Sequence, residues 1–417
     1  MHHNMAGMTT DVRAPDRLPR DYLAWLAAAF ISRTGDAAMY FALGWAGSAY
    51  GGTAAGLIIT AIVVPRTVLL LLGGAIGDRF GSRAIMIAGD ATLMFSTTIL
   101  FFTVVLVGSP IWLLITAAFL EGIVTAFYLP ASGSMPRRLV NDAVLPRALA
   151  LRGVGSELAD LAGGPLGGLL VGLAGFAAAA GVNAVSFAAV LIVLIVVRPT
   201  REVAQVQRRP VLIEAGEGVR LAMSHAVIRT SLLLTGMLAG LVIPVGSVLL
   251  PLLIRGRGWS PVVAGATLGA QSLGSIAVAL VISRRGAHRR PGLVAILGLF
   301  LTVLALELLA FASTAGVAVS SGVLLGAGIS LFTSHTAPLI LGQAPITHLA
   351  RVQAVLSVIQ SAMLVLTTPL LGLGSSQFGA PAAITACGAL LAVGGIAAAL
   401  SRPFRCTRTQ SPQPELA

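Results

Sequence analysis

Residues 54–106 read AAGLIITAIVVPRTVLLLLGGAI (54–76), GDRFGSR (77–83) and AIMIAGDATLMFSTTILFFTVVL (84–106). Each apolar run has the roughly 20 residues that a helix needs to cross the hydrocarbon core of a bilayer. The seven residues between the runs hold one aspartate and two arginines. Because charged groups are costly inside a bilayer, these seven residues predict a short loop outside it. The stretch therefore predicts two membrane-spanning helices joined by a polar turn.

The same pattern of apolar runs and short polar gaps extends over the whole chain. Of its 417 residues, 56% are hydrophobic and only 10% are charged, whereas a soluble protein has about 25% charged residues. Runs of spanning length fall near 23–48, 54–76, 84–106, 110–131, 151–173, 176–197, 230–254, 261–283, 292–312, 316–341, 351–374 and 380–400. We therefore expect an all-α membrane protein with about twelve transmembrane helices.

A long polar segment divides these runs into two sets of six. The resulting expected organisation is a tail (1–22), a six-helix bundle (23–197), a central loop (198–229), a second six-helix bundle (230–400) and a second tail (401–417). A weak internal repeat supports the division, since a shift of 204 positions places Pro165 and Gly168 on Pro369 and Gly372. Parallel repeats of this kind are typical of transporters that hold their substrate in a central cavity between the halves.

The arginines predict the orientation of the chain in the membrane. All 27 basic residues are arginine. The gaps 77–83, 132–150, 198–229 and 284–291 contain arginine, and the gap 342–350 is followed directly by Arg351. The alternate gaps contain none, except for Arg255 and Arg257. Since short cytoplasmic loops retain the positive charge, we expect both termini in the cytoplasm and the chain in the cytoplasmic (inner) membrane.

Several other classes of protein fit the composition poorly. A net charge of +12 would suggest a nucleic-acid partner in a soluble protein, but here the arginines are scattered between apolar runs. Two cysteines, Cys387 and Cys406, form no disulfide framework or metal motif. The polar first 21 residues are unlike a cleavable signal peptide. A membrane-embedded enzyme is a rival class, but no nucleotide loop or His/Cys cluster supports it, so we expect no enzyme activity, cofactor or metal.

The turn that follows the second run carries a family resemblance. Residues Gly74-Ala75-Ile76-Gly77-Asp78-Arg79-Phe80-Gly81-Ser82-Arg83 resemble the loop signature G-x-L-x-D-R-x-G-R-R of the major facilitator superfamily, with Ser82 in place of one basic residue. The resemblance implies a conformational latch formed by Gly74, Asp78, Arg79, Gly81 and Arg83. The alternative is a solvated turn whose arginines anchor it at the membrane surface.

Further motifs resemble one branch of that superfamily, the drug/proton antiporters that include macrolide and enterobactin exporters. They are Ser32-Arg33-Thr34-Gly35-Asp36, Phe127-Tyr128-Leu129-Pro130-Ala131 and Asn183-Ala184-Val185-Ser186-Phe187. The fifth span departs from the antiporter signature, because Asp160 stands where a glycine is expected. The fourth span departs as well, since Ala118 replaces an arginine and Glu121-Gly122 replaces a Gln-Gly pair.

Charged residues inside the predicted spans are candidates for proton coupling. A charged side chain at the bilayer centre costs about 2.5–3.5 kcal/mol on insertion scales, so it normally faces a cavity or a partner. Asp36 and Glu121 are the expected proton carriers, with Arg33 or Arg66 beside them, and Glu157 and Asp160 lie three residues apart in the fifth span. Burial favours the neutral form of a carboxyl group and an arginine favours the charged form, so a conformational change can switch proton binding.

A permanent internal ion pair is the alternative for this set of charges. Asp90 lies near the end of a span and Glu307 stands alone, so we expect both to be locally paired. His335 lies between Ser334 and Thr336, and we expect it to be hydrogen-bonded rather than to carry protons.

The lining of the substrate cavity is less clearly encoded than the charges. Aromatic and amide side chains in the spans are the candidates, namely Tyr40, Phe41, Phe127, Tyr128, Asn183, Gln271 and Gln360. We expect a monomeric exporter of a small amphipathic or hydrophobic, drug-like compound, exchanged for protons by alternating access. A siderophore or metabolite exporter of the same branch and a proton-coupled importer are the alternatives.

Overall fold

The computed structural model describes residues 17–197, 224–286, 288–343 and 349–406, and these residues form helices and connecting turns without a strand. The first set is α1 (Arg20–Ser48), α2 (Gly52–Phe80), α3 (Ser82–Val107), α4 (Ile111–Leu139) and α5 (Leu145–Val196). The second set is α7 (Ala226–Pro244), the π-helix η1 (Val245–Leu249), α8 (Leu250–Gly256), α9 (Pro261–Arg285), α10 (Pro291–Ala310), α11 (Ala315–Gln343), α12 (Leu349–Phe378), α13 (Ala380–Leu400) and α14 (Arg402–Cys406).

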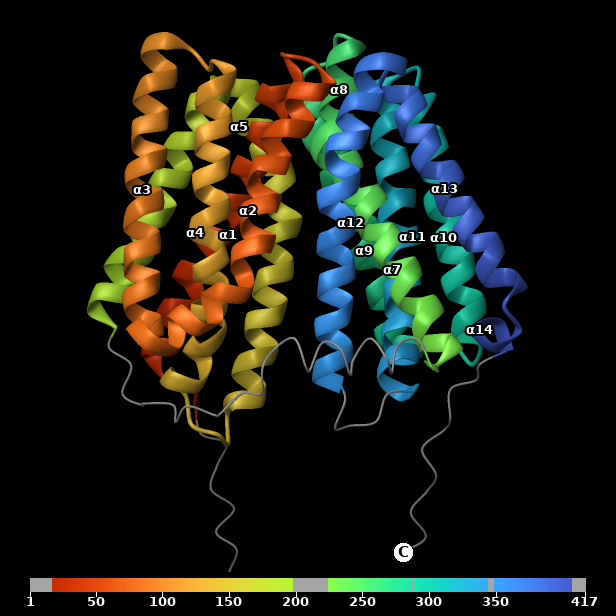
Figure 1. Ribbon diagram of the computed structural model, residues 1–417, viewed down its shortest axis with the longest axis horizontal. Coiled ribbons are helices and arrows are strands. Elements are labelled where there is room, and N and C mark those ends of the chain that lie inside the picture. The colour runs from red at the N-terminus through yellow and green to blue at the C-terminus, as the bar shows by residue number, and fades with distance from the viewer. Residues whose placement is uncertain (1–16, 198–223, 287, 344–348, 407–417) are drawn as a thin grey trace, which may run out of the picture.

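These helices account for the twelve expected spans. Within the described residues, ten helical segments are long and apolar enough to cross a membrane, and α7, η1 and α8 together form one of them. The 52-residue α5 holds two spans, because Gly175 has a φ of 78° and breaks the helix between the predicted runs 151–173 and 176–197. The 29-residue α1 runs alongside the others as a further crossing (Figure 1). The prediction of an all-α protein with about twelve transmembrane helices is confirmed.

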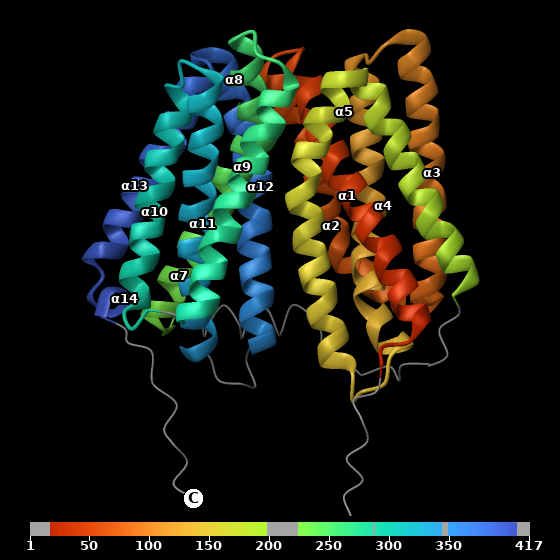
Figure 2. The same ribbon diagram turned by 180° about the vertical axis from the view of Figure 1, so that it is seen from behind.

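The helices form two bundles that lie side by side. Figures 1 and 2 show α1–α5 in one bundle and α7–α13 in the other. Across the boundary, α5 contacts α9 and α2 contacts α12. We call the end of the molecule where α1 begins and α14 lies the tail end, and the opposite end, where α1 ends and α2 begins, the far end (Figure 1).

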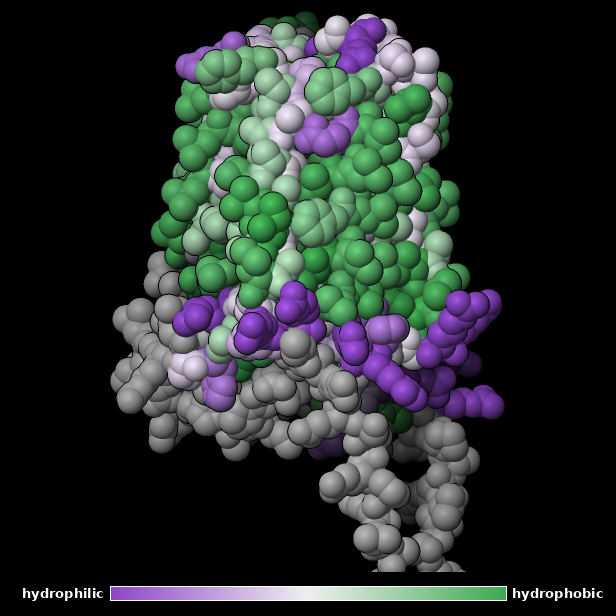
Figure 3. Space-filling model, turned by 90° about the vertical axis from the view of Figure 1, so that its right-hand side faces the viewer, coloured by the Kyte–Doolittle hydropathy of each residue, from purple (hydrophilic) through white to green (hydrophobic). Residues whose placement is uncertain are grey.

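The outer surface matches a membrane environment. Figure 3 shows an apolar face that ends in a hydrophilic band at the tail end. The described segments at this end carry Arg284 and Arg285 at the end of α9, Arg290 before α10, and Arg402 and Arg405 on α14. Side chains of this kind suit the interface between hydrocarbon and water.

Several helices continue past the predicted span boundaries at the tail end. Helix α4 runs on to Leu139 and α5 already begins at Leu145, so most of the predicted gap 132–150 is helical. The predicted second tail begins with α14. Hydropathy marks where a segment leaves the hydrocarbon, but a helix does not have to end there. Residues 198–223 of the predicted central loop (198–229) lie outside the described residues, and α7 begins at Ala226.

Glycines hold the two bundles together towards the far end. A Cβ atom added to Gly168 would lie 2.6 Å from Cα of Gly265, and one added to Gly56 would lie 3.0 Å from Cα of Gly372. Small residues permit such close approach of transmembrane helices. Gly168 and Gly372 are the two glycines that the internal repeat aligns, so the repeat marks equivalent contacts in the two halves. The space between the bundles lies on the tail side of these contacts.

Candidate functional site

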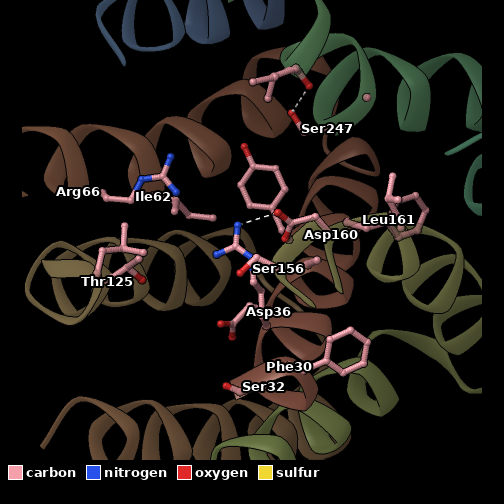
Figure 4. Close-up of a pocket in the computed structure, with 18 of the residues that line it drawn as sticks. Phe30, Ser32, Asp36, Ile62, Arg66, Thr125, Ser156, Asp160, Leu161 and Ser247 are labelled. Carbon is pink, nitrogen blue, oxygen red and sulfur yellow. Dashed lines mark hydrogen bonds and ion pairs between the residues drawn. The ribbon is translucent and has the colours of Figure 1, made fainter. Parts of the chain in front are cut away.

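A cavity of about 790 Å³ lies between the two bundles. Its volume falls within the roughly 300–1,000 Å³ typical of small-molecule sites. The first bundle lines it from α1 to α5, and the second from α7, η1, α9, α11 and α12. Figure 4 shows Asp36, Arg66, Thr125 and Asp160 from the first bundle around this hollow, with Ser247 of η1 across from them.

The two walls of the cavity differ sharply in charge. Among the described lining residues, all the charged ones belong to the first bundle: Arg33, Asp36, Arg66, Asp90, Glu121, Arg152 and Asp160. The second bundle contributes apolar side chains such as Leu238, Val242 and Leu268, with uncharged polar groups that include Gln271 and Gln360. The cavity therefore has one ionisable wall and one apolar wall.

Asp36 projects from the middle of α1 into this cavity (Figure 4). The preceding Gly35 lies against α5, where an added Cβ would come within 2.6 Å of Oδ1 of Asn183. This close packing of α1 on α5 fixes the direction in which Asp36 points. Its Oδ1 atom is buried and has no hydrogen-bond partner in the described structure.

Arg33 pairs with Asp160 rather than with Asp36. Its Nη2 atom lies 2.6 Å from Oδ2 of Asp160 on α5, and both side chains remain more than 40% exposed to the cavity. Arg33 was expected beside the carboxyl groups of Asp36 or Glu121, and the ion pair that it forms is with a residue 127 positions away. An exposed ion pair of this kind contributes little stability, so it can open at little cost.

Glu121 and Arg66 come together because α4 packs tightly on α2. A Cβ atom added to Gly122 would lie 2.4 Å from the carbonyl oxygen of Ile62 and 2.7 Å from Cγ of Pro65. The neighbouring Glu121 and Arg66 therefore both line the cavity, from two helices that pack against each other.

Most of the predicted site residues line the cavity. The charged ones that do so are Arg33, Asp36, Arg66, Glu121 and Asp160, and the uncharged ones are Tyr40, Phe41, Tyr128, Gln271 and Gln360. The structure places Glu157, Phe127 and Asn183 elsewhere.

Helix geometry explains these three exceptions. Arg152, Ser156 and Asp160 form the cavity-facing stripe of α5 at a spacing of four residues, and the exposed Glu157 falls outside it. Phe127 is one residue from Tyr128 and so points about 100° away around α4. Asn183, only 2% exposed, lies behind α1 and accepts a hydrogen bond from Ser186.

The loop signature lies at the tail end, between α2 and α3. Gly81 has a φ of 81°, which a glycine adopts without strain, and it separates the two helices. Arg83 donates hydrogen bonds from Nε to the carbonyl of Leu194 and from Nη2 to that of Ile195, both 3.0 Å long. It thereby caps the C-terminal end of α5. Gly74, Asp78 and Arg79 belong to α2, but their side chains lie outside the described residues.

The far end is closed by an arginine that breaks the charge pattern of the sequence. Arg255, at the end of α8, donates hydrogen bonds from Nε to Oγ of Ser48 (2.8 Å) and from Nη2 to the carbonyl of Trp45 (3.0 Å). Its guanidinium lies 4.6 Å from the centre of the Trp45 ring. Since α8 and α1 belong to different bundles, Arg255 bridges the two halves.

Two cavity residues were missed or misjudged in the sequence. Arg152 was not among the predicted site residues, yet it lines the cavity and its Nη2 lies 3.5 Å from Oγ of Ser132. Asp90 has the expected local partner, Tyr128, but it also lines the cavity. A spacing of four with Ser156 and Asp160 is the signal that would have found Arg152. Glu307 and His335 are hydrogen-bonded, as expected. Glu307 accepts a hydrogen bond from Thr385, and a ring nitrogen of His335 is bonded to the carbonyl of Leu331.

The family model of the Major Facilitator Superfamily matches residues 25–363, more than half of the chain. The chain belongs to this superfamily. It is therefore a multi-pass membrane transporter of a small molecule, with its cavity between two bundles of six spans. Among curated proteins, none matches the chain by sequence.

Solved structures of transporters share the fold of this superfamily member. One is a bacterial homologue of the human lysosomal transporter Spinster in an inward-facing, unoccupied conformation, at a TM-score of 0.75 and 14% identity over 94% of this chain and 99% of that one. The nucleoside transporter NupG matches at a TM-score of 0.72 and 11% identity, over 91% of this chain and 100% of that one. A POT family transporter in complex with 5-aminolevulinic acid matches at a TM-score of 0.70 and 14% identity, over 93% of this chain and 97% of that one. At these identities the likeness concerns the fold alone.

Proposed function

We propose that this transporter exports a small amphipathic or hydrophobic compound in exchange for protons, by alternating access of the cavity to the two sides of the membrane. The observation that carries the proposal is the division of the cavity into an ionisable wall and an apolar wall. We place the tail end in the cytoplasm on the basis of the arginine distribution.

The apolar wall suits the hydrophobic part of such a compound. Leu238, Val242 and Ile243 from α7 and Leu268 from α9 line the cavity, and burial of apolar surface against such side chains contributes about 25 cal/mol per Å². Gln271 and Gln360 add hydrogen-bonding groups to the same wall. A compound with a polar end and an apolar body could contact both walls at once.

The ionisable wall suits proton exchange. Asp36 and Glu121 face the cavity, which Arg33 and Arg66 also line. Burial favours the neutral form of a carboxyl group, and a nearby cation favours its charged form. A compound that binds beside these carboxyl groups, or a change in their exposure to water, alters the balance between the protonated and ionised forms. Binding of substrate and of protons then become competing events in one cavity, which is the requirement for exchange.

Transport in proteoliposomes under an imposed pH gradient tests the proposal. We would follow the amphipathic dye rhodamine 6G, with a nucleoside and a dipeptide as probes for other substrate classes. The variants are Asp36→Asn and Glu121→Gln, and Glu157→Gln is the control because Glu157 is exposed outside the cavity. We expect proton-driven dye export by wild type and by the control, and loss of coupling in both cavity variants.

The same experiment decides between the alternatives. Export of a siderophore or metabolite but not of the dye would identify another substrate within the same mechanism. Uptake that rises with an inward proton gradient would support an importer and refute export. Full coupling in both cavity variants would refute the assignment of Asp36 and Glu121.

A further inference from the structure

Asp90 is a buried carboxyl group that the proposed mechanism does not use. It lies on α3, is 1% exposed, and lines the cavity. Its Oδ2 atom accepts a hydrogen bond of 3.1 Å from the hydroxyl of Tyr128, and its buried Oδ1 atom has no partner in the described structure. One oxygen is therefore held in place, while the other is left without a donor.

The packing of α3 on α4 builds this arrangement. A Cβ atom added to Gly89 would lie 3.1 Å from Cδ2 of Tyr128 and 3.3 Å from Cγ1 of Val124. Glycine at this position lets the tyrosine ring lie against α3, which brings its hydroxyl to the next residue, Asp90. The contact thus depends on a specific small residue beside the acid.

The position of Asp90 along the bundle distinguishes it from the central carboxyl groups. Eight residues separate it from the start of α3 at Ser82, which is about 12 Å at 1.5 Å per residue. Asp36 lies sixteen residues from the start of α1 at Arg20, or about 24 Å. Both helices begin at the tail end (Figure 1). Asp90 therefore stands between the central carboxyl groups and the tail end of the cavity.

The charged and titratable groups near Asp90 come from three other helices. Tyr128 on α4 and Asp36 on α1 are close enough to act on its charge, and Arg152 on α5 acts on Tyr128. Arg152 lies 6.0 Å from the ring centre of Trp25 and is bonded to Ser132, so no ion pair neutralises Asp90 in the described structure. A buried carboxylate with one neutral donor is poorly compensated. Such a group changes its proton occupancy when water reaches it.

We propose that Asp90, held by Tyr128, is a third proton-carrying carboxyl group that passes protons between Asp36 and the tail end of the cavity. In the transfer, the carboxyl group of Asp36 gives a proton to a water molecule in the cavity, and that water gives a proton to an oxygen of Asp90. Asp36 keeps the electron pair of its broken O–H bond, and Asp90 releases its proton to water at the tail end. The inference rests on the proposed proton exchange.

Four proteins test this role in proteoliposomes: wild type, Asp90→Asn, Asp90→Glu and the control Glu157→Gln. Asparagine keeps an oxygen that accepts the Tyr128 hydrogen bond but binds no proton. Glutamate keeps the titratable carboxyl group on a side chain that is longer by one methylene group. The measurements are the transport of rhodamine 6G and the proton flux that this transport drives, read with a pH-sensitive dye in the lumen.

For Asp90→Asn we expect the proton flux per transported dye molecule to fall by roughly tenfold or more, in line with the loss of a proton-transfer group. Asp90→Glu should recover much of that flux. The role of Asp90 is refuted if Asp90→Asn keeps the wild-type proton flux. It is also refuted if Asp90→Glu disrupts transport and Asp90→Asn does not, because a purely structural hydrogen bond to Tyr128 would tolerate asparagine better than glutamate. If wild type itself drives no proton flux, proton exchange fails and this role fails with it.

Discussion

Loss of Arg255 should release the closed far end of the transporter. The side chain forms two hydrogen bonds and one ring contact with α1 of the other bundle, at Ser48 and Trp45. Arg257 is a matched control, because it bonds the carbonyls of Ala310 and Ala312 within its own bundle. We would compare Arg255→Met with Arg257→Met, since methionine keeps the apolar stem and removes the guanidinium.

The size of the effect follows from these contacts. A hydrogen bond to a charged group contributes roughly 1.5–3 kcal/mol at most, and an exposed cation–π contact about 0.5–1 kcal/mol. Arg255 is exposed, so water competes for its hydrogen bonds and replaces them when the far end opens. We therefore expect a net shift of about 1–2 kcal/mol, or roughly 5–30-fold in the equilibrium between closed and open far ends.

Distances between spin labels report this equilibrium directly. Cysteines at Val107, at the end of α3, and Ser313, after α10, would carry the labels on exposed positions of the two bundles. Cys387 and Cys406 are first replaced by alanine and serine. Arg255→Met should raise the population with a long distance, and Arg257→Met should leave it near the wild-type value. Equal behaviour of the two variants would refute the assignment of Arg255 as the bridge.

Two further predictions concern glycines at close contacts. Gly168→Ala should lower stability by about 1–3 kcal/mol or lengthen the spin-label distance at the far end, because its Cβ would lie 2.6 Å from Cα of Gly265. Thermal unfolding and the spin labels measure these effects, and a variant that matches wild type in both would contradict the prediction. Gly122→Ala should impair proton-coupled transport while the protein stays folded, because its Cβ would meet the carbonyl of Ile62 at 2.4 Å and push α4 from α2. Gly133→Ala, whose Cβ would meet nothing within 4 Å, is the control for both and should behave as wild type.

The architecture could be predicted from the sequence because the bilayer imposes strong rules. Span length and the cost of buried charge determined the twelve crossings, and the short gap at 174–175 coincides with the break at Gly175. The ends of helices such as α4 could not be predicted, because a helix that leaves the membrane has no need to stop there.

The cavity could be predicted only in part, because the sequence shows charge but not the face of a helix. Asp36 and Glu121 stand out in apolar runs, whereas Leu238 and Val242 look like any other apolar residue of a span. The partner of Arg33 could not be found either, since Asp160 lies on a distant helix. Such contacts depend on how helices pack, which the apolar pattern leaves open.

Proton release on substrate binding tests the central claim most directly. Rhodamine 6G would be added to the detergent-solubilised transporter in weakly buffered solution, with a pH-sensitive dye as the readout. The account predicts that wild type releases protons as the dye binds, and that the double variant Asp36→Asn, Glu121→Gln does not. Equal dye binding without any proton release by wild type would contradict it.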